Sequence, residues 1–361
     1  MQPSVLIICS ITGDAPSRPD AGLVIGLHRL GVEVDVMIPP GSSFVQRFGD
    51  MGIRVIPVHP RRKLSLRSIL LIRKEIRNRK YGIIHLFNTK AIVNGSLAAI
   101  GLPVKVIAYR GAAGMYWYDP TAWLSHLNRR IDYLICNSRY VQEHMQRQLI
   151  FRPQKAVMIH KGMDPAWFKD VVPVSRQVLG IPDDVLLLGC VANVRRIKGV
   201  SSLLKATYVM DPGLPVHMLL IGNGMDTRHY LRLIRQSPFR NRIHMLGYRP
   251  DVYEVVAACD MYIQPSLSES LSRSVMEAMC LGIPCIVSDA GGLVELIEHD
   301  GSGLVAEKGN AESIAMAIQK LATDRSMRKK FAARGLERMK QLFSVENMVR
   351  NTLELYRKAL S

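Results

Sequence analysis

Two glutamates eight residues apart stand in a stretch that could bind an anionic ligand. Glu269 lies in a loop of small residues after a short apolar run, and Glu277 lies in a helix expected over residues 272–280. Gly282 and Pro284 end that helix. Because the first backbone N–H groups of a helix have no partner within it, the loop and helix start are a candidate diphosphate site.

Two hypotheses account for Glu277. Residues 275–276 and 278–279 beside it are apolar, so we expect its carboxylate to be buried and to need partners. The partner is either a structural Arg or backbone group, or the hydroxyl pair of a bound sugar, as in nucleotide-binding folds. Glu269 on its own fits an ordinary solvated loop acid equally well, or a residue on the opposite side of bound phosphates.

A cationic loop holds Arg195, Arg196 and Lys198. It follows the apolar run Val185–Val191 and precedes a helix expected over Val200–Tyr208. Three cations at the end of a strand can neutralise an anionic leaving group. A solvated basic loop is the alternative.

Short apolar runs alternate with segments of helical period, which predicts an α/β fold with parallel sheets built from βαβ units. In the first half we expect strands at Val5–Cys9, Val32–Ile38, Arg54–Val58, Gly82–Leu86, Val104–Tyr109, Tyr133–Asn137 and Ala156–Ile159. In the second half we expect them at Val185–Val191, His217–Ile221, Ile243–Leu246, Met261–Gln264 and Ile283–Val287.

The Gly- and Pro-marked stretch Ile159–Pro165 separates the two sets of strands and predicts a hinge. We therefore expect domains over residues 1–163 and 164–344, facing each other across a cleft at the carboxyl ends of their strands. Residues 345–361 should form a final amphipathic helix.

Several motifs of the second half together resemble the retaining glycosyltransferases of family 4, which have the GT-B fold of two Rossmann-like doubly wound domains. The resemblance rests on Ala192–Gly199, Leu219–Gly224, Leu246–Val252, Cys259–Met279 and Asp289–Glu295. It includes the Glu-x7-Glu signature of that family as Glu269 and Glu277. His160–Asp164 is similar to the interdomain linker of the family, and the C-terminal segment to its closing helix, which implies that residues 345–361 pack back on the N-terminal domain.

The resemblance implies that Lys198, helped by Arg195 or Arg196, holds the donor diphosphate and that Glu269 contacts the donor sugar. The backbone amides near them would bind sugar and phosphate, and they belong to Ser270, Leu271 and Ser272. Many relatives have Gly-Arg where this chain has Ala192-Asn193, so the phosphate-binding arginine has to come from the next loop positions. Ser270 stands where the family often has Gly, which would narrow the sugar pocket.

The same resemblance implies that Glu277 holds the ribose hydroxyls. Tyr248 and Arg249 would flank the base, and the turn at Gly222 would lie close to the nucleotide.

The first half departs from the family at one position. Family members commonly have a His near the anomeric carbon of the donor, where this chain offers Arg110, which could bind phosphate or an anionic acceptor or be a plain surface residue. Gly13, in the loop Ser10–Asp14 after the first strand, is a candidate for approaching the donor. His85, Asn88 and Lys90 could line the acceptor side, although a lone His at a strand end is more often structural.

Residues 61–80 hold nine basic side chains and one acidic one, with Leu66, Ile69, Leu70, Ile72 and Ile76 at helical spacing. This pattern predicts a basic amphipathic helix that could lie on an anionic membrane or contact a phosphorylated lipid acceptor, or present a solvated cationic face. The aromatic loop Gly114–Pro120 could stack on sugars or touch an interface.

Charge and composition bound the function. The 361-residue chain has a net charge of +18, and residues 1–165 carry 23 basic and 10 acidic groups. The first half should therefore meet something anionic. The sequence contains no apolar run of about 18 residues, so we expect no membrane-spanning helix. The N-terminus does not resemble a signal peptide. We therefore expect a cytoplasmic protein, with peripheral attachment to the inner membrane as an option. The six cysteines form no CxxC pair and are expected to be buried hydrophobes.

We therefore expect a retaining hexosyltransferase that transfers a sugar from a UDP- or GDP-sugar to a glycan or lipid-linked acceptor. The expected setting is lipopolysaccharide or other surface-glycan synthesis. We expect no cofactor, and no metal because an Asp-x-Asp motif is missing. The alternatives are a GT-B nucleotide-sugar epimerase or phosphorylase, and a basic nucleic-acid-binding protein. We do not expect nucleic acid as a partner, because no recognisable motif for it occurs.

Overall fold

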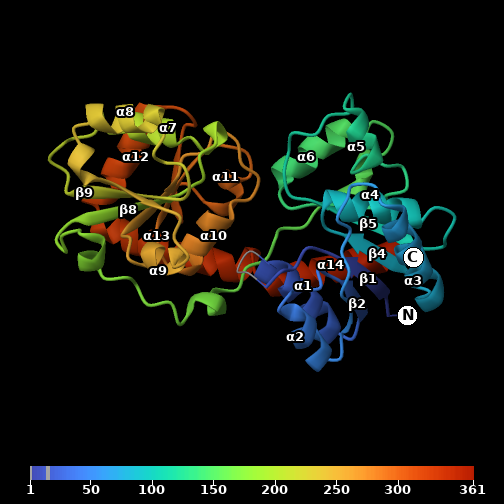
Figure 1. The fold of residues 1–361 in the computed structure, drawn as a ribbon. Coiled ribbons are helices and arrows are strands. Elements are labelled where there is room, and N and C mark those ends of the chain that lie inside the picture. The colour runs from blue at the N-terminus through green and yellow to red at the C-terminus, as the bar shows by residue number, and fades with distance from the viewer. Residues whose placement is uncertain (1, 14–16) are drawn as a thin grey trace. The chain divides into compact units, whose positions relative to one another are not determined.

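The computed structural model describes residues 2–13 and 17–361 and divides into two compact units (Figure 1). The first unit runs to Gly162 and resumes at Phe343–Ser361, and the second is Met163–Leu342. The boundaries expected from sequence, at 163/164 and 344/345, lie one and two residues further on. The chain thus crosses between the units twice.

The first unit holds a seven-stranded parallel sheet in the order β3-β2-β1-β4-β5-β6-β7. Its strands are β1 (Ser4–Ile8), β2 (Glu33–Met37), β3 (Arg54–Ile56), β4 (Ile83–Leu86), β5 (Lys105–Arg110), β6 (Tyr133–Cys136) and β7 (Ala156–Met158). Its helices are α1 (Arg18–Arg29), α2 (Phe44–Asp50), α3 (Leu66–Arg79), α4 (Thr89–Ala98), α5 (Pro120–Leu124), α6 (Arg139–Gln148) and α14 (Val345–Leu360).

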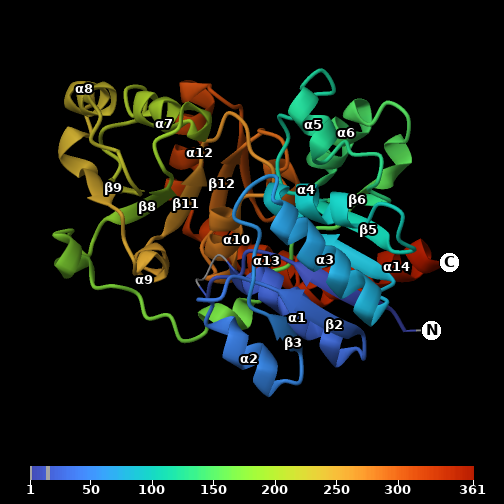
Figure 2. The ribbon, with the colours of Figure 1, turned by 45° about the vertical axis from the view of Figure 1, so that its right-hand side comes forward.

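Both faces of this sheet are buried, as parallel sheets require. Side chains alternate along a strand, so Val5 and Ile7 join the core under α1, α2 and α14, whereas Leu6 and Ile8 join the core under α3, α4 and α6. Helices α3 and α4 lie side by side on the second of these faces (Figure 2). The strands read as continuous apolar runs in the sequence for this reason.

The last helix, α14, packs against α1 in the first unit. Gly26 of α1 permits the close approach, because a Cβ atom there would lie 2.4 Å from Cγ2 of Val349. Tyr356 is buried, and its hydroxyl lies 2.7 Å from Nδ1 of His85. His85 is therefore a structural residue of this core and is not placed to contact an acceptor.

The second unit holds a six-stranded parallel sheet in the order β10-β9-β8-β11-β12-β13. Its strands are β8 (Leu186–Val191), β9 (Val216–Ile221), β10 (Ile243–Gly247), β11 (Met261–Gln264), β12 (Cys285–Ser288) and β13 (Gly303–Ala306). Its helices are α7 (Val200–Ala206), α8 (Arg228–Gln236), α9 (Val252–Ala257), α10 (Arg273–Cys280), α11 (Leu293–Leu296), α12 (Ala311–Thr323) and α13 (Arg325–Leu342).

The predicted α/β class is confirmed, with each expected strand within two residues of its observed bounds. The sequence analysis missed β13, an edge strand. All six cysteines are buried and unpaired, as expected. None of the helices in the described ranges is long and apolar enough to span a membrane.

The predicted amphipathic helix over residues 61–80 is shorter than expected, because α3 begins at Leu66 with Ser65 as its N-cap. Only Ile72 and Ile76 of its apolar residues are buried. Leu66 is 71% exposed and Leu70 is 57% exposed. The prediction that these two leucines belong to a packed apolar face was therefore wrong. Their exposure adds apolar side chains to the cationic surface of α3.

Candidate functional site

The candidate site lies in the second unit where the strand order reverses. β8 has β9 on one side and β11 on the other, so the chain order changes direction at β8. Crevices at the carboxyl ends of strands beside such a reversal are the usual ligand sites of open α/β sheets. The loops that follow β8 and β11 are the ones that carry Lys198 and Glu269.

A glycine brings these two loops into contact. Gly199 has φ +69°, and a Cβ atom there would lie 1.7 Å from the carbonyl oxygen of Pro265, so only glycine fits. The N–H of Leu267 donates to the carbonyl oxygen of Ile197 at 2.7 Å. The backbone therefore fixes the distance between the cationic loop and the glutamate loop.

The side chains of the two loops form an ion pair. Nζ of Lys198 lies 2.5 Å from Oε2 of Glu269, and the two side chains are only 23% and 17% exposed. The carbonyl oxygen of Glu269 also accepts a hydrogen bond from the N–H of Gly292 at 3.2 Å. The structure thus brings together two residues that the sequence analysis assigned to diphosphate and sugar.

The loop after β9 closes on the same edge. Gly222 has φ +136°, and a Cβ atom there would lie 2.1 Å from the carbonyl oxygen of Ala192. The N–H of Val194 donates to the carbonyl oxygen of Asn223 at 3.2 Å. The Gly222 turn is therefore packed directly against the start of the cationic loop, in which Arg195 and Arg196 are exposed.

Among the described residues, no side chain caps the N-terminus of α10. Ser272 occupies the N-cap position, but its hydroxyl lies 3.1 Å from that of Ser274 and does not accept from a helix N–H. Ser274 in turn donates to Oε1 of Gln264 at 3.0 Å. Before this helix, Ser270 is half-buried and Leu271 is buried. The first backbone N–H groups of α10 have no side-chain cap and are therefore suited to bind an anionic ligand.

Glu277 is half-buried, which is less than the burial expected from its apolar neighbours. Positions 274 and 277 lie three residues apart on the helix, on a face that is partly open, while the apolar neighbours of Glu277 point to the core. The hydroxyl of Tyr253 donates to Oε1 of Glu277 at 3.2 Å. A tyrosine of α9 is thus one partner of this carboxylate, a possibility that the sequence analysis did not weigh beside the structural Arg or backbone group and the sugar hydroxyls.

Tyr248 and Arg249 follow β10 and differ in their surroundings. Tyr248 is 70% exposed. Arg249 makes two hydrogen bonds to the carboxylate of Asp251, at 2.8 and 2.5 Å. This pairing raises the pKa of Arg249 and lowers the pKa of Asp251. Asp251, which the sequence analysis did not weigh, therefore holds the guanidinium.

In the first unit, Arg110 ends β5 and turns back on its own loop. Its Nε donates to the carbonyl oxygen of Ala112 at 2.5 Å and its Nη2 to that of Ala113 at 3.0 Å. Partial burial lowers the pKa of this guanidinium. Arg110 is thus held by the 110–113 loop and is partly buried, which differs from the plain surface residue that was the alternative in the sequence analysis.

Gly13 has φ +116°, and a Cβ atom there would lie 2.3 Å from Oγ of Ser43. The glycine is therefore required by packing against the segment before α2. Asp14, the last residue of that predicted loop, lies outside the described residues.

A polar cluster at the carboxyl edge of the first sheet contains Asn88 and Ser10, which the sequence analysis weighed, and His59, which it missed. Nδ2 of Asn88 donates to Oγ of Ser10 at 2.8 Å and contacts Nε2 of His59 at 3.0 Å. Burial and the nearby charge of Lys90 lower the pKa of His59. A His-Pro pair directly after the third predicted strand was the available sequence signal.

Comparisons with known proteins agree with this architecture. Residues 171–338 match the family described as Glycosyl transferases group 1, and residues 21–167 match Glycosyltransferase Family 4. Together the two matches leave only residues 168–170 uncovered between 21 and 338. The chain is a glycosyltransferase with the GT-B fold.

Three individual relatives illustrate the similarity. The chain is 26% identical to the lipopolysaccharide core biosynthesis glycosyltransferase LpsE of Rhizobium meliloti, over 92% of this chain and 93% of that protein. It is 26% identical to the N-acetyl-alpha-D-glucosaminyl L-malate synthase of Bacillus anthracis, but that match covers 57% of this chain and 55% of the relative. The crystal structure of HepE from Anabaena in complex with UDP has a TM-score of 0.77 at 21% identity, and it covers 98% of this chain and 100% of HepE.

Proposed function

We propose that this glycosyltransferase is a retaining, metal-independent hexosyltransferase that moves a sugar from a UDP- or GDP-sugar to a glycan or glycolipid acceptor. The single observation that carries the proposal is the Lys198–Glu269 pair beside the uncapped start of α10, at the strand-order reversal. The UDP complex of HepE and the lipopolysaccharide role in the name of LpsE support the donor and acceptor classes.

In the reaction, the bond between the anomeric carbon and the diphosphate oxygen breaks while the acceptor oxygen bonds to the same face of the sugar. The acceptor proton passes to the departing phosphate oxygen. Negative charge therefore develops on the diphosphate, and Lys198, the exposed Arg195 and Arg196, and the amides at the start of α10 would stabilise it. This arrangement supplies positive charge from the protein itself.

The two glutamates have separate roles in this proposal. Glu269 would accept hydrogen bonds from hydroxyls of the donor sugar and hold Lys198 in place before the donor arrives. Glu277 would accept hydrogen bonds from the ribose hydroxyls, with Tyr253 fixing its carboxylate from the other side. Ser270 adds a side chain beside the sugar, and Tyr248 offers an exposed ring to the base.

The first unit would bind the acceptor. Its excess of basic residues and the exposed cations and leucines of residues 61–80 suit a phosphorylated lipid-linked glycan at an anionic membrane. The exposed rings of Tyr116, Trp117 and Tyr118 suit sugar stacking. We propose that the enzyme works at the cytoplasmic face of the inner membrane as a peripheral protein.

Thermal unfolding with UDP, GDP, ADP and dTDP tests the donor site, because a ligand that binds only the folded state raises the melting temperature. We expect one nucleotide to stabilise the wild type and to lose this effect in Glu277→Ala. Glu337→Ala, which removes an exposed carboxylate from α13 of the same unit, is the matched control and should behave as wild type.

Product analysis with the sugar conjugate of that nucleotide separates the remaining enzymes. A transferase releases the nucleoside diphosphate and a glycosylated acceptor with the anomeric configuration of the donor. An epimerase would yield the isomeric sugar and a phosphorylase would consume phosphate, so either result would contradict the proposal, as would stabilisation by none of the nucleotides.

A further inference from the structure

A cavity of about 290 Å³ lies in the first unit, apart from the candidate donor site. Its walls come from the segment that leads into β6, residues 123–131, and the segment that leads into β7, residues 148–155. These segments precede their strands, so much of the cavity lies toward the amino edge of the sheet, whereas Ser10, Asn88 and Arg110 follow strands at the carboxyl edge. Neither the transferase chemistry nor the family matches assign it a role.

One wall of this cavity is apolar and continues to the surface. Leu127 is buried at its base, and Trp123 and Leu149 line it. At the mouth, Ile150 is 54% and Phe151 69% exposed. An apolar lining that runs out onto exposed aliphatic and aromatic side chains suits a ligand with a hydrocarbon chain.

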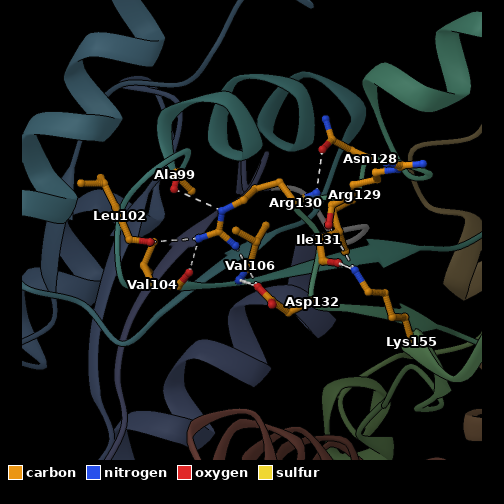
Figure 3. A network of polar contacts seen from close by, with 10 residues as sticks. All are labelled: Ala99, Leu102, Val104, Val106, Asn128, Arg129, Arg130, Ile131, Asp132 and Lys155. Atoms are coloured by element: carbon orange, nitrogen blue, oxygen red, sulfur yellow. Dashed lines mark hydrogen bonds and ion pairs between the residues drawn. The ribbon is translucent and has the colours of Figure 1, made fainter. Parts of the chain in front are cut away.

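The rim is cationic. Arg129, Arg152 and Lys155 line the cavity, and the guanidinium of Arg129 lies 5.3 Å from the ring centre of Phe151. Nζ of Lys155 donates to the carbonyl oxygens of Arg129 and Ile131, so the lysine ties the two segments together (Figure 3). Arg129 and Arg152 are exposed.

The nearby acid does not neutralise this rim. The carboxylate of Asp132 accepts from Nη1 of Arg130 at 3.0 Å and from the N–H of Val106 at 2.8 Å. Figure 3 shows the Arg130 guanidinium directed at the carbonyl oxygens of Ala99, Leu102 and Val104 and at Asp132. Asp132 is therefore matched by Arg130, and burial together with the charge of Arg152 lowers the pKa of Lys155. The exposed guanidinium groups of Arg129 and Arg152 remain for an anion, and the ammonium of Lys155, which donates to two backbone carbonyl oxygens, lies in the same wall.

A buried histidine forms part of the cavity wall. His126 lines the cavity and is 3% exposed, and its Nδ1 has no hydrogen-bond partner within the described part of the chain. Burial lowers the pKa of this ring to about 3, so it is neutral at pH 7, while it keeps a hydrogen bond to the backbone of Tyr109. His126 therefore adds a buried, neutral ring to the wall and contributes no positive charge to the site.

We propose that this cavity binds a phosphorylated lipid as a single molecule. Its hydrocarbon chain lies along Trp123, Leu127 and Leu149, and its phosphate lies between Arg129, Arg152 and Lys155. The charge excess of the rim favours phosphate over a neutral head group, and the apolar wall favours a chain over inorganic phosphate. The inference rests on the first unit alone and does not depend on the proposed transferase reaction.

Dodecyl phosphate below its micelle concentration is the probe, with the fluorescence of Trp123 as the readout. The full chain has three tryptophans, so Trp117→Phe with Trp167→Phe leaves Trp123 as the only one. The contact from Nε1 of Trp123 to the backbone oxygen of residue 117 is kept in this background. We expect a saturable change in fluorescence, and the same titration with UDP present should give the same affinity.

Charge reversal identifies the rim. Arg129→Glu and Arg152→Glu change exposed side chains and should each weaken dodecyl phosphate binding at least tenfold. Lys329→Glu, an exposed position on α13, is the matched control and should have no effect. Arg67→Glu on α3 should also have no effect, which separates this cavity from the surface of residues 61–80.

Two further ligands separate the possible sources of binding. Dodecyl maltoside tests the chain with a neutral head group, and inorganic phosphate tests the anion alone, and we expect both to bind at least tenfold more weakly. Equal affinity for dodecyl maltoside, equal affinity for inorganic phosphate, or an absence of saturable binding by dodecyl phosphate would each overturn the proposal. Melting curves of every variant verify that it is folded.

Discussion

The ammonium group of Lys198 lies 2.5 Å from Oε2 of Glu269, across the two loops that flank the strand-order reversal at β8. In the proposed reaction, the donor diphosphate would compete with this carboxylate for the ammonium group of Lys198. Because a half-buried ion pair loses much of its hydration, replacing the carboxylate by phosphate oxygens exchanges one charged partner for another. In this proposal, the ion pair would link donor binding to the orientation of Glu269.

Glu269→Gln should separate binding from turnover. It removes the charge that competes for Lys198, so we expect the nucleoside diphosphate to bind at least as tightly as to wild type. The variant should lower kcat about 100-fold or more, because an oriented carboxylate beside the sugar is lost. Titration calorimetry with the nucleoside diphosphate and steady-state kinetics measure the two effects.

Lys198→Gln should weaken binding of the nucleoside diphosphate about tenfold or more, in contrast to Glu269→Gln, since a charge-assisted contact to phosphate is lost. Lys205→Gln, an exposed lysine on α7, serves as the control. If Glu269→Gln weakened binding as much as Lys198→Gln, the competition between the carboxylate and the phosphate would be refuted.

Gly199→Ala should distort the contact between the two loops. The new Cβ atom would lie 1.7 Å from the carbonyl oxygen of Pro265, and φ is +69°. We expect a loss of roughly 2–3 kcal/mol in the free energy of unfolding, from overpacking together with backbone strain. Gly180→Ala is the matched control, because Gly180 has φ +68° and no atom within 4 Å of the added Cβ.

Denaturation of the two variants measures the difference. Gly180→Ala reports the cost of the positive φ alone, on the order of 1 kcal/mol. Equal stabilities for the two variants would mean that the loops yield without cost, and that the spacing of Lys198 and Glu269 is not fixed by this glycine.

The sequence was sufficient for the sheets because buried parallel strands leave a local pattern, whereas Lys198 and Glu269 were singled out by a resemblance to a family. Buried parallel strands are apolar on both faces, so β8 and β11 stand out as runs, and the resemblance to the family signature pointed to Glu269 and Glu277. The four-residue edge strand β13 was missed, because Gly303–Ala306 has neither the length nor the flanking punctuation of the others. Short edge strands depend on pairing with a neighbour, here β12, which a local pattern does not contain.

Side-chain partners were the part that the sequence did not supply. Asp251 holds Arg249, and Tyr253 contacts Glu277 from another helix, so these roles follow from packing and not from spacing. The neighbours of Glu277 in sequence are apolar, yet its own direction on α10 leaves it half-buried. Residue types gave the chemistry, whereas the three-dimensional contacts decide which groups are available.

Acid should destabilise the first unit through His85. Burial lowers its pKa to about 3 in the folded state, against about 6.5 when unfolded. The unfolded chain therefore binds more protons between these values, so stability is full above pH 6.5 and is lost as the pH falls through this window. The loss from this group at pH 5 should be roughly 2 kcal/mol.

His85→Gln should reduce this acid sensitivity, since an amide can contact the hydroxyl of Tyr356 but does not titrate in this range. Denaturant unfolding at pH 7.5 and pH 5, in a Trp167→Phe background, follows the first unit through its own tryptophans. An unchanged difference between the two pH values in His85→Gln would show that other groups cause the acid sensitivity.

Binding to anionic vesicles should depend on the exposed cations of α3. Arg67 and Lys74 are exposed beside the exposed leucines 66 and 70, whereas Arg73 donates to the carbonyl oxygens of Ala98 and Ile100. We expect the double variant Arg67→Glu with Lys74→Glu to lower the affinity for phosphatidylglycerol-containing vesicles at least tenfold, because each basic residue near an anionic surface adds about 1 kcal/mol.

Co-sedimentation at two salt concentrations measures this effect. Raising the salt from 50 to 300 mM should weaken the wild type more than the double variant, since screening acts on the charges that the variant has lost. Arg228→Glu with Lys329→Glu, exposed cations of the second unit, is the control. Equal vesicle binding by both double variants would refute the assignment of α3 as the membrane surface.

The role of Glu277 is best tested by changing the ligand and the protein together. If its carboxylate accepts hydrogen bonds from the ribose, wild type should bind UDP about tenfold to a hundredfold more tightly than 2′-deoxy-UDP, because hydrogen bonds to charged groups contribute roughly 1.5–3 kcal/mol. Glu277→Gln should lose most of this preference by binding UDP more weakly, with little change for the deoxy compound. Tyr253→Phe, which removes the tyrosine hydroxyl that donates to the carboxylate, should keep the preference, since the ribose contacts remain.

A preference for UDP that survived in Glu277→Gln would place the ribose elsewhere and leave Glu277 as a structural partner of α9. If the chain prefers a different nucleotide, the same comparison with its ribo and deoxy forms applies, so the test depends on the sugar of the nucleotide and not on its base.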